Sequence, residues 1–177
     1  MRLKARLLIT SAIVTAALLS SVNMVAKAQS TINDAVRVRC SADLTLNSGS
    51  WNTLGWDIED YKSTAGMHDN STNNSRLVAP NTGVYLMTTF GLLTSNGGFF
   101  GTRAFRFELN GTTELAENSF IATSINIGVQ SLSVVTKLNA GDYVEVGFFQ
   151  DSGSEQTFDC TNATVKPHAT LTYLTAG

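Results

Sequence analysis

The chain has 177 residues, with 12 lysines and arginines against 14 aspartates and glutamates and a formal net charge of −2. This length suffices for one domain with a hydrophobic core of its own. The acidic balance argues against binding to nucleic acid or to an anionic membrane surface, because both rest on clustered lysine and arginine.

The N-terminus has the three parts of a secretory signal peptide. Three of the first six residues are basic, residues 7–19 are mostly apolar, and Ala26 and Ala28 place small side chains where a signal peptidase cuts. Cleavage after Ala28 removes four basic side chains and leaves 8 basic against 14 acidic ones, a net charge of −6. The alternative is an uncleaved membrane anchor, for which the apolar core is short.

We therefore expect export to the extracellular space or the periplasm, and no membrane span in the mature protein. The sequence is divided into a signal peptide (1–28), a short extension (29–34) and one domain (35–177).

Two cysteines, Cys40 and Cys160, lie in the mature part of the chain. Export favours a disulfide between them, and the alternative is two buried thiols. A bridge over so long a loop is worth about 4–5 kcal/mol in the chain-entropy model. Their wide separation excludes a compact metal-binding pair such as CxxC.

The first part of the domain alternates between apolar and polar residues, as half-buried strands do. One such run covers 35–42, and a second covers 53–59 with Leu54, Trp56 and Ile58 facing inward. Residues 62–75 are polar, with one glycine and many Asn, Ser and Thr, and predict an exposed loop.

The stretch from Arg76 to Leu93 is apolar on both faces. A turn at Pro80–Gly83 begins a strand in which side chains alternate in direction. One face has Val84, Leu86, Phe90 and Leu92, and the other has Tyr85, Met87 and Leu93. A strand that is apolar on both faces must be covered on both, so we expect a second copy of the chain to cover one of them.

The remaining strands are short and separated by turns. They are expected at 103–110, 112–123, 125–138, 143–150 and 165–174, with a hairpin signal at Asn110-Gly111. Eight to ten strands without a helix predict an all-β antiparallel sandwich.

Two of the predicted strands, 84–94 and 125–136, carry no charge on either face, whereas 103–110 and 142–150 have one charged face. This difference indicates one sheet exposed to solvent and one sheet buried in an oligomer. The candidate oligomer interface consists of Tyr85, Met87, Leu93, Leu132 and Val134.

The order of several short motifs resembles a known family. They are Trp51–Tyr61, Gly66-Met67-His68, Ala79-Pro80 followed by Gly83-Val84-Tyr85, Asn110-Gly111, and Leu138 followed by Ala140-Gly141-Asp142-Tyr143-Val144-Glu145. The set is similar to the globular head of complement C1q and its tumour-necrosis-factor-like relatives, and most similar to the bacterial and phage-borne branch. The resemblance covers 36–174 and implies a jelly roll that assembles as a homotrimer.

The chain departs from the family in two places. No collagen-like Gly-X-Y stalk precedes the domain, and the last strand reads Pro167-His168-Ala169-Thr170-Leu171 where relatives often have an aromatic residue followed by glycine. The missing stalk leaves open how a trimer is attached to other structures.

The sequence offers little for catalysis. The two histidines, His68 and His168, have no Gly-x-Ser-x-Gly serine near them, so no Ser-His-Asp triad is indicated. Asp57, Glu59 and Asp60 are the densest carboxylates, and Asp57 and Glu59, which share a strand face, could contribute to a calcium site or form an acid/base pair. The alternative is a solvated strand face.

Two loops are further candidates for binding. Asp69 lies among Asn70, Asn73 and Asn74, an oxygen-rich group that could bind Ca²⁺ but lacks the spacing of a known calcium loop. We expect no other cofactor. Phe99 and Phe100, in the glycine-rich loop 95–101, form a candidate binding loop unless they pack beneath it or at a trimer axis.

The sequence thus favours a secreted, non-enzymatic C1q-like module that trimerises and binds a protein or glycan. One alternative is a monomeric secreted carbohydrate-binding β-sandwich. Another is a glycan hydrolase that uses Asp57, Glu59 or Asp60, which the fold class alone does not exclude.

Overall fold

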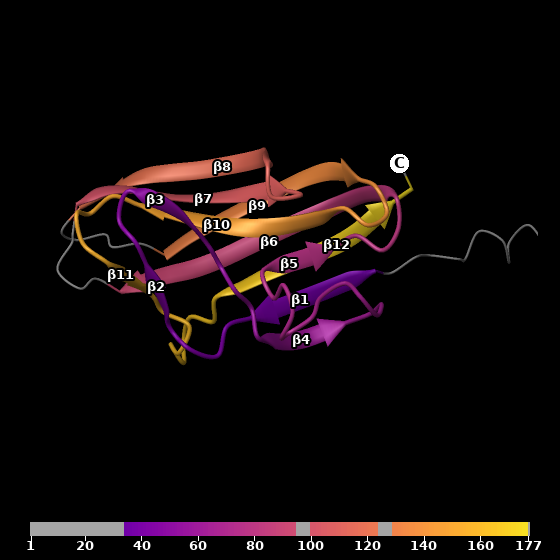
Figure 1. Ribbon diagram of the computed structural model, residues 1–177, viewed down its shortest axis with the longest axis horizontal. Helices are drawn as coiled ribbons and strands as arrows, with labels where there is room; N and C mark the ends of the chain where they lie inside the picture. Colours follow the sequence, from indigo (N-terminus) through magenta and orange to yellow (C-terminus); the bar gives the residue numbers. More distant parts are fainter. Residues whose placement is uncertain (1–33, 95–99, 124–128, 177) are drawn as a thin grey trace, which may run out of the picture. The chain divides into compact units, whose positions relative to one another are not determined.

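The computed structural model describes residues 34–94, 100–123 and 129–176, and in these ranges the chain forms twelve strands and no helix (Figure 1). These residues therefore contain no helix that is long and apolar enough to cross a bilayer. The strands are β1 (Ala35–Arg39), β2 (Leu44–Leu46), β3 (Ser50–Thr53), β4 (Ile58–Lys62), β5 (Arg76–Val78), β6 (Gly83–Thr94), β7 (Gly101–Leu109), β8 (Thr113–Ala122), β9 (Val129–Leu138), β10 (Tyr143–Gln150), β11 (Gln156–Phe158) and β12 (His168–Thr175).

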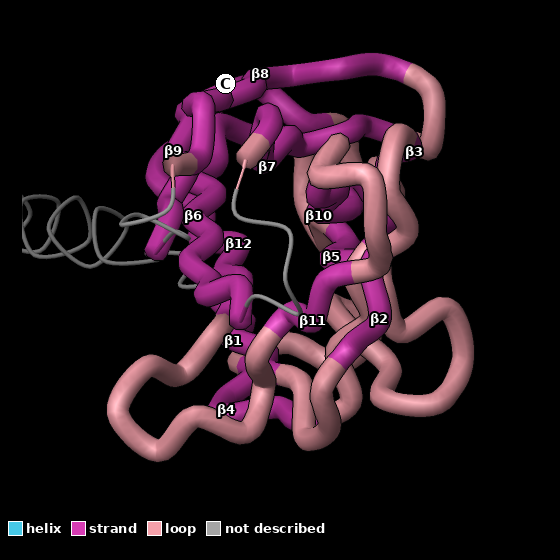
Figure 2. The backbone as a smooth tube through the Cα atoms, turned by 90° about the vertical axis from the view of Figure 1, so that its left-hand side faces the viewer, coloured by secondary structure: helices cyan, strands magenta, loops and turns pink. Residues whose placement is uncertain are grey.

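The strands form two antiparallel sheets packed face to face as a jelly roll. The first sheet has the order β2-β11-β6-β12-β1-β4, and β9 pairs with β6 along the edge opposite β12. The second has the order β3-β10-β7-β8, with β5 also paired to β10. Figure 2 shows the two layers, with β6, β9 and β12 in one and β3, β7 and β10 in the other. The predicted fold class is confirmed.

The core lies between the sheets and is built from alternate residues of each strand. In β6 the burial alternates without a break over its 12 residues. Phe105 and Phe148 of the second sheet meet edge to face, with ring centroids 4.8 Å apart. Phe158 of β11 packs against both of these rings and against Trp56. Burial of each such side chain contributes about 1.5–3 kcal/mol.

The alternation predicted for β6 is correct, but the residues assigned to the oligomer interface lie on the inward face of the first sheet. Tyr85 and Met87 are fully buried in the chain's own core and Leu93 is 2% exposed, while Leu132 and Val134 pack against the same core. Met87 faces Val134 across the β6–β9 ladder, so the two strands turn the same set inward.

The opposite face of the first sheet is therefore its outer face. In β6 this face carries Val84, Leu86, Thr88, Phe90 and Leu92, all half-buried.

The sequence analysis also placed some strand ends incorrectly. The run at 53–59 is divided, because β3 belongs to the second sheet and β4 to the first, and the chain crosses between the sheets at 54–57. The short strands β2 and β11 were not predicted. The turn between β7 and β8 is confirmed at Asn110 and Gly111, whose φ angles are 53° and 69°.

The predicted disulfide is confirmed. Cys40 follows β1 directly and bonds to Cys160 in the segment between β11 and β12, with the two Cα atoms 5.4 Å apart. The bond closes a loop of 120 residues.

The two long sides of the sandwich are closed in different ways. On one side β8 meets β9, where the Asn118 side chain donates to the carbonyl of Ser131 (3.0 Å) and Gln130 donates to the carbonyl of Asn118 (2.7 Å). On the other side β4 and β5 form no ladder with each other, and the segment at 63–75 connects them.

Candidate functional site

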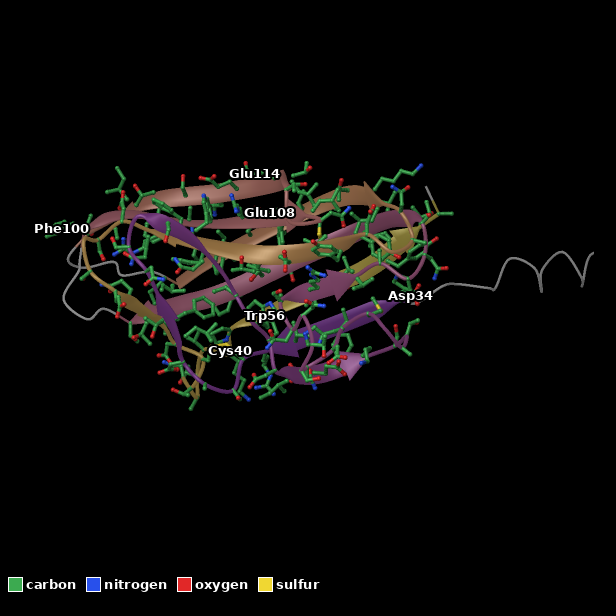
Figure 3. All side chains as sticks on the ribbon, in the orientation of Figure 1. Asp34, Cys40, Trp56, Phe100, Glu108 and Glu114 are labelled. Atoms are coloured by element: carbon green, nitrogen blue, oxygen red, sulfur yellow. A yellow bond between two sulfur atoms is a disulfide. The ribbon has the colours of Figure 1, made fainter. Side chains whose placement is uncertain are left out.

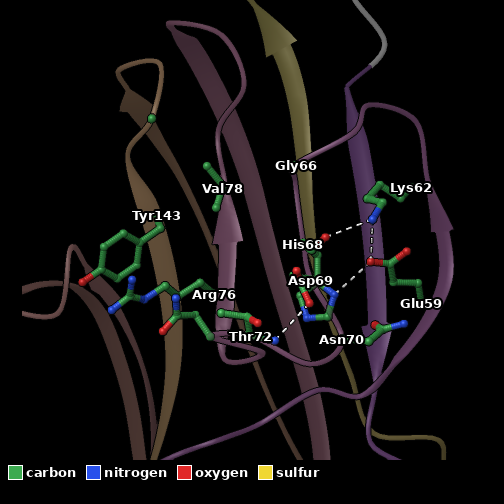
Figure 4. Close-up of a pocket in the computed structure, with 12 residues that line it drawn as sticks. Glu59, Lys62, Gly66, His68, Asp69, Asn70, Thr72, Arg76, Val78 and Tyr143 are labelled. Carbon is green, nitrogen blue, oxygen red and sulfur yellow. Dashed lines mark hydrogen bonds and ion pairs between the residues drawn. The ribbon is translucent and has the colours of Figure 1, made fainter.

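The segment 63–75, hereafter the connecting loop, is anchored to the second sheet and to the crossover at 54–57. The N–H of Val78 in β5 donates to the carbonyl of Met67 (2.8 Å), and the N–H of Trp56 donates to the carbonyl of Asn74 (3.0 Å). Met67 itself is fully buried. A pocket of about 790 Å³ lies beside this loop and is lined by residues from β4, β5 and β10 (Figure 4).

His68 forms the inner part of this pocket, and its side chain has no exposed surface. Its Nδ1 lies 3.1 Å from Oε1 of Glu59, and its Nε2 lies 3.0 Å from the carbonyl oxygen of Asn74. Both ring nitrogens therefore lie within hydrogen-bond distance of an acceptor oxygen. His68 thereby joins β4 to the end of the connecting loop.

Glu59 and Lys62 form one wall of the pocket. The Lys62 ammonium donates to Oε1 of Glu59 (2.8 Å) and to the carbonyl of His68 (2.9 Å). The hydrogen bond from Lys62, with a further one from His68, lowers the pKa of the Glu59 carboxyl. Glu59 is therefore a carboxylate at neutral pH and holds the histidine and the lysine in place.

Asp69 holds the tip of the connecting loop. Its Oδ1 accepts hydrogen bonds from the N–H (2.9 Å) and O–H (2.8 Å) of Ser71 and from the N–H of Thr72 (3.0 Å). These bonds, first the one from Thr72 and then those from Ser71, lower the pKa of Asp69 to about 2. Within the described ranges, no three His, Cys, Asp or Glu side chains are grouped to hold a metal ion.

Arg76 and Tyr143 form the opposite wall. The guanidinium carbon of Arg76 lies 4.0 Å from the centroid of the Tyr143 ring, a cation–π contact. The Nε of Arg76 lies 3.6 Å from Oε1 of Glu145, which accepts a hydrogen bond from the hydroxyl of Ser75 (2.6 Å). Figure 4 shows Arg76 and Tyr143 on one side and Lys62 and Glu59 on the other, with His68 and Asp69 between them.

The three carboxylates considered for hydrolysis do not share one site. Asp57 accepts hydrogen bonds from the N–H and hydroxyl of Ser41, and these lower its pKa. Asp60 is paired with Arg39 and Arg37. A general acid needs a carboxyl with a raised pKa, whereas Asp57 and Glu59 both have lowered ones.

The outer face of the first sheet is a second candidate surface. Across the ladders from β6 it continues on β9 with Ser133 and Val135 and on β12 with His168 and Thr170. Val135 is 55% exposed. The rings of Phe90 and His168 lie 5.8 Å apart beside a smaller pocket of about 400 Å³, and burial lowers the pKa of His168.

The candidate binding loop is only partly described. Phe99 lies outside the described residues, whereas Phe100 is 66% exposed. Figure 3 shows Phe100 at the end of the sandwich opposite Asp34. The sequence analysis did not identify Ile121, which is 77% exposed and pairs with Thr102 close to Phe100.

Sequence comparison finds no relative: no family model matches the chain, and no curated protein matches it. Solved structures do match. Murine APRIL at pH 5.0 has a TM-score of 0.58 at 12% identity, covering 81% of this chain and 100% of that one. The Eiger TNF of S. frugiperda has a TM-score of 0.52 at 15% identity, covering 83% and 96%. Murine APRIL at pH 8.5 scores 0.55 at 14% identity. The fold of this chain is a TNF-like jelly roll.

Proposed function

We propose that this chain is a secreted, non-enzymatic module of the C1q-like branch, which assembles as a homotrimer through the outer face of its first sheet and binds a protein or glycan. The observation that carries the proposal is the composition of that face. A soluble monomer rarely leaves a large contiguous apolar surface uncovered.

The centre of the outer face is apolar or hydroxylated. Leu86 has Val135 of β9 on one side and Thr172 of β12 on the other, and Thr88 has Ser133 and Thr170. Charges occur towards the rims, as at Lys137 in β9. A depletion of charge at the centre with polar groups around it is characteristic of protein interfaces.

The TNF-like fold supports the same assembly. The family that the sequence resembles forms trimers, and the two runs without charged residues, in β6 and in β9 up to Thr136, pair with each other in the first sheet. Export is supported by the disulfide, because such bonds persist in oxidising compartments. The signal peptide at 1–28 is a prediction from the sequence.

The test is the solution mass of the mature protein by light scattering on a sizing column. We expect a mass near three chains. Val135→Asp changes a side chain that is 55% exposed in the single chain, so it costs the isolated domain little. In the trimer it buries an unpaired charge, which is strongly unfavourable, and we expect a monomer.

The matched control is Thr53→Asp, which adds the same charge at an exposed position of β3 in the second sheet. This variant should remain a trimer. A wild-type protein of one-chain mass, or a Val135→Asp protein of three-chain mass, contradicts assembly through the outer face.

A monomeric carbohydrate-binding sandwich is the second candidate. It is favoured by the pocket of about 790 Å³, which a single chain forms by itself. Because this pocket is lined mainly by charged and polar side chains, with Val78 and the Tyr143 ring among them, it suits a polar ligand. Glycan binding by a monodisperse monomer would favour this candidate over the trimeric module.

A further inference from the structure

We propose that the pocket between β4, β5 and the connecting loop binds an acidic sugar, with the sugar carboxylate on Arg76 and its hydroxyls on the loop. This inference rests on the proposed binding role and names the place and the chemical class of the ligand. It is independent of the oligomeric state, since one chain supplies every lining residue.

The pocket has the size and position of a ligand site. Its volume of about 790 Å³ falls within the range of about 300–1,000 Å³ usual for small-molecule sites. It lies where the edges of the two sheets part, so its two walls belong to different sheets. The buried His68, whose ring nitrogens lie 3.1 Å from Glu59 and 3.0 Å from the Asn74 carbonyl, fixes the inner surface of the pocket.

Arg76 is the group best placed to bind an anion. Stacking on Tyr143 fixes the plane of its guanidinium. Its Nε is buried and forms only a long ion pair of 3.6 Å with Glu145, without a hydrogen bond among the described residues, whereas 37% of the side chain is exposed. The two terminal nitrogens of a guanidinium oriented in this way can bind a carboxylate through two parallel N–H donors.

Lys62, the other basic side chain of the pocket, already has hydrogen-bond partners. The Lys62 ammonium has hydrogen bonds to Glu59 and to the carbonyl of His68. Binding a ligand carboxylate there would compete with the Glu59 carboxylate for the same donors. The ligand carboxylate is therefore assigned to Arg76.

The connecting loop supplies partners for hydroxyl groups. Asp69 is ionised at neutral pH because its pKa is about 2. All three hydrogen bonds found for its side chain within the described residues go to Oδ1, so Oδ2 can accept from a sugar hydroxyl. Asn70 and Asn73 also line the pocket, and an amide can both donate to and accept from hydroxyl groups.

The experiment uses two probes that differ only at carbon 6, methyl β-D-glucuronide and methyl β-D-glucoside. Each is titrated into the ¹⁵N-labelled mature protein, and amide shifts are followed by NMR. We expect the glucuronide to bind at least about tenfold more tightly, because it alone offers a carboxylate to the guanidinium. The shifts should be concentrated in the connecting loop and β5.

Arg76→Gln should abolish the preference for the glucuronide. The matched control is Arg106→Gln, which removes a guanidinium stacked on Trp51 at 4.3 Å in the same sheet but outside the pocket. It should keep the preference. Arg76→Lys is a second, milder variant that keeps the charge and loses the two-donor geometry, and it should reduce the preference in part.

The inference is overturned if the two probes bind equally, if neither binds, if the shifts lie elsewhere, or if Arg76→Gln or Arg76→Lys keeps the full preference. Light scattering on the same samples tests the proposed assembly separately. A trimer that does not prefer the glucuronide overturns only the pocket assignment. A monomer that binds as expected overturns only the assembly.

Discussion

Gly91 in β6 provides a direct test of how the two sheets pack. A Cβ atom added there would lie less than 3.0 Å from two ring atoms of Phe158 and 3.0 Å from the ring of Phe105. Both rings are fully buried, and Phe158 also packs edge-on against Trp56. The absence of a side chain at this position makes room for the aromatic cluster.

The cost of Gly91→Ala follows from two opposing effects. Overpacking a filled core costs about 1–3 kcal/mol, and relief of the conformational freedom of glycine in a strand returns about 0.5–1 kcal/mol. We expect a net loss of about 1–2 kcal/mol in the free energy of unfolding, measured by urea denaturation under conditions in which wild type and variant have the same solution mass.

A double-mutant cycle identifies the cause. Phe158→Leu removes the ring that the new methyl group would meet, so the two losses should be less than additive by at least about 0.5 kcal/mol. A Gly91→Ala variant as stable as wild type would refute the packing argument. So would losses that add fully, because Gly91 and Phe158 would then act independently.

Three further outcomes are expected. Replacement of both Cys40 and Cys160 by serine should lower the free energy of unfolding by up to about 4–5 kcal/mol, because the bond closes a loop of 120 residues; a thermal midpoint equal to that of wild type would contradict this. His68→Ala removes the two hydrogen bonds of a buried ring to Glu59 and to the Asn74 carbonyl, each worth about 0.5–1.5 kcal/mol, and should make the connecting loop the first site of limited proteolysis; cleavage elsewhere first would contradict the anchoring role. The pKa of Asp69 is lowered to about 2 in the folded state from an ordinary value of 3.8, so its contribution to stability is present above pH 4 and is lost as the pH falls towards 2; Asp69→Asn should reduce the acid dependence of unfolding over that interval, and an unchanged dependence would count against it.

The fold class could be predicted from the sequence because strands and hairpins leave local, periodic patterns in it. Alternation in β1, β7 and β10 and the turn at Asn110-Gly111 each predict strands and hairpins directly. The inward face of β6 could not be predicted in the same way, because both of its faces are apolar. The inward-facing residues of β6 include Thr89 and Gly91, which lower the apparent hydrophobicity of that face. Gly91 is nevertheless part of the core, because the rings of Phe158 and Phe105 leave no room for a side chain there.

The pocket could not be predicted from sequence patterns, for a different reason. Glu59 was singled out as a possible catalytic residue and His68 as part of the Gly66-Met67-His68 motif, but not as hydrogen-bonded partners. Arg76 and Tyr143 lie far apart in the sequence and meet because β5 pairs with β10. That ladder has only three residue pairs, too few to be read from the alternation of the two segments.

The position of the disulfide affects how the domain resists mechanical tension. Ala35 pairs with Thr172, so the start of β1 and the end of β12 lie at the same end of one antiparallel ladder. Force applied between Asp34 and Thr175 would peel that ladder one pair at a time instead of shearing it. Cys40 lies just beyond the last pair, Arg39 with His168, and is bonded to Cys160. The bond would stop the peeling after five pairs and keep the two strands tethered, so that they can re-form their ladder once the tension is released.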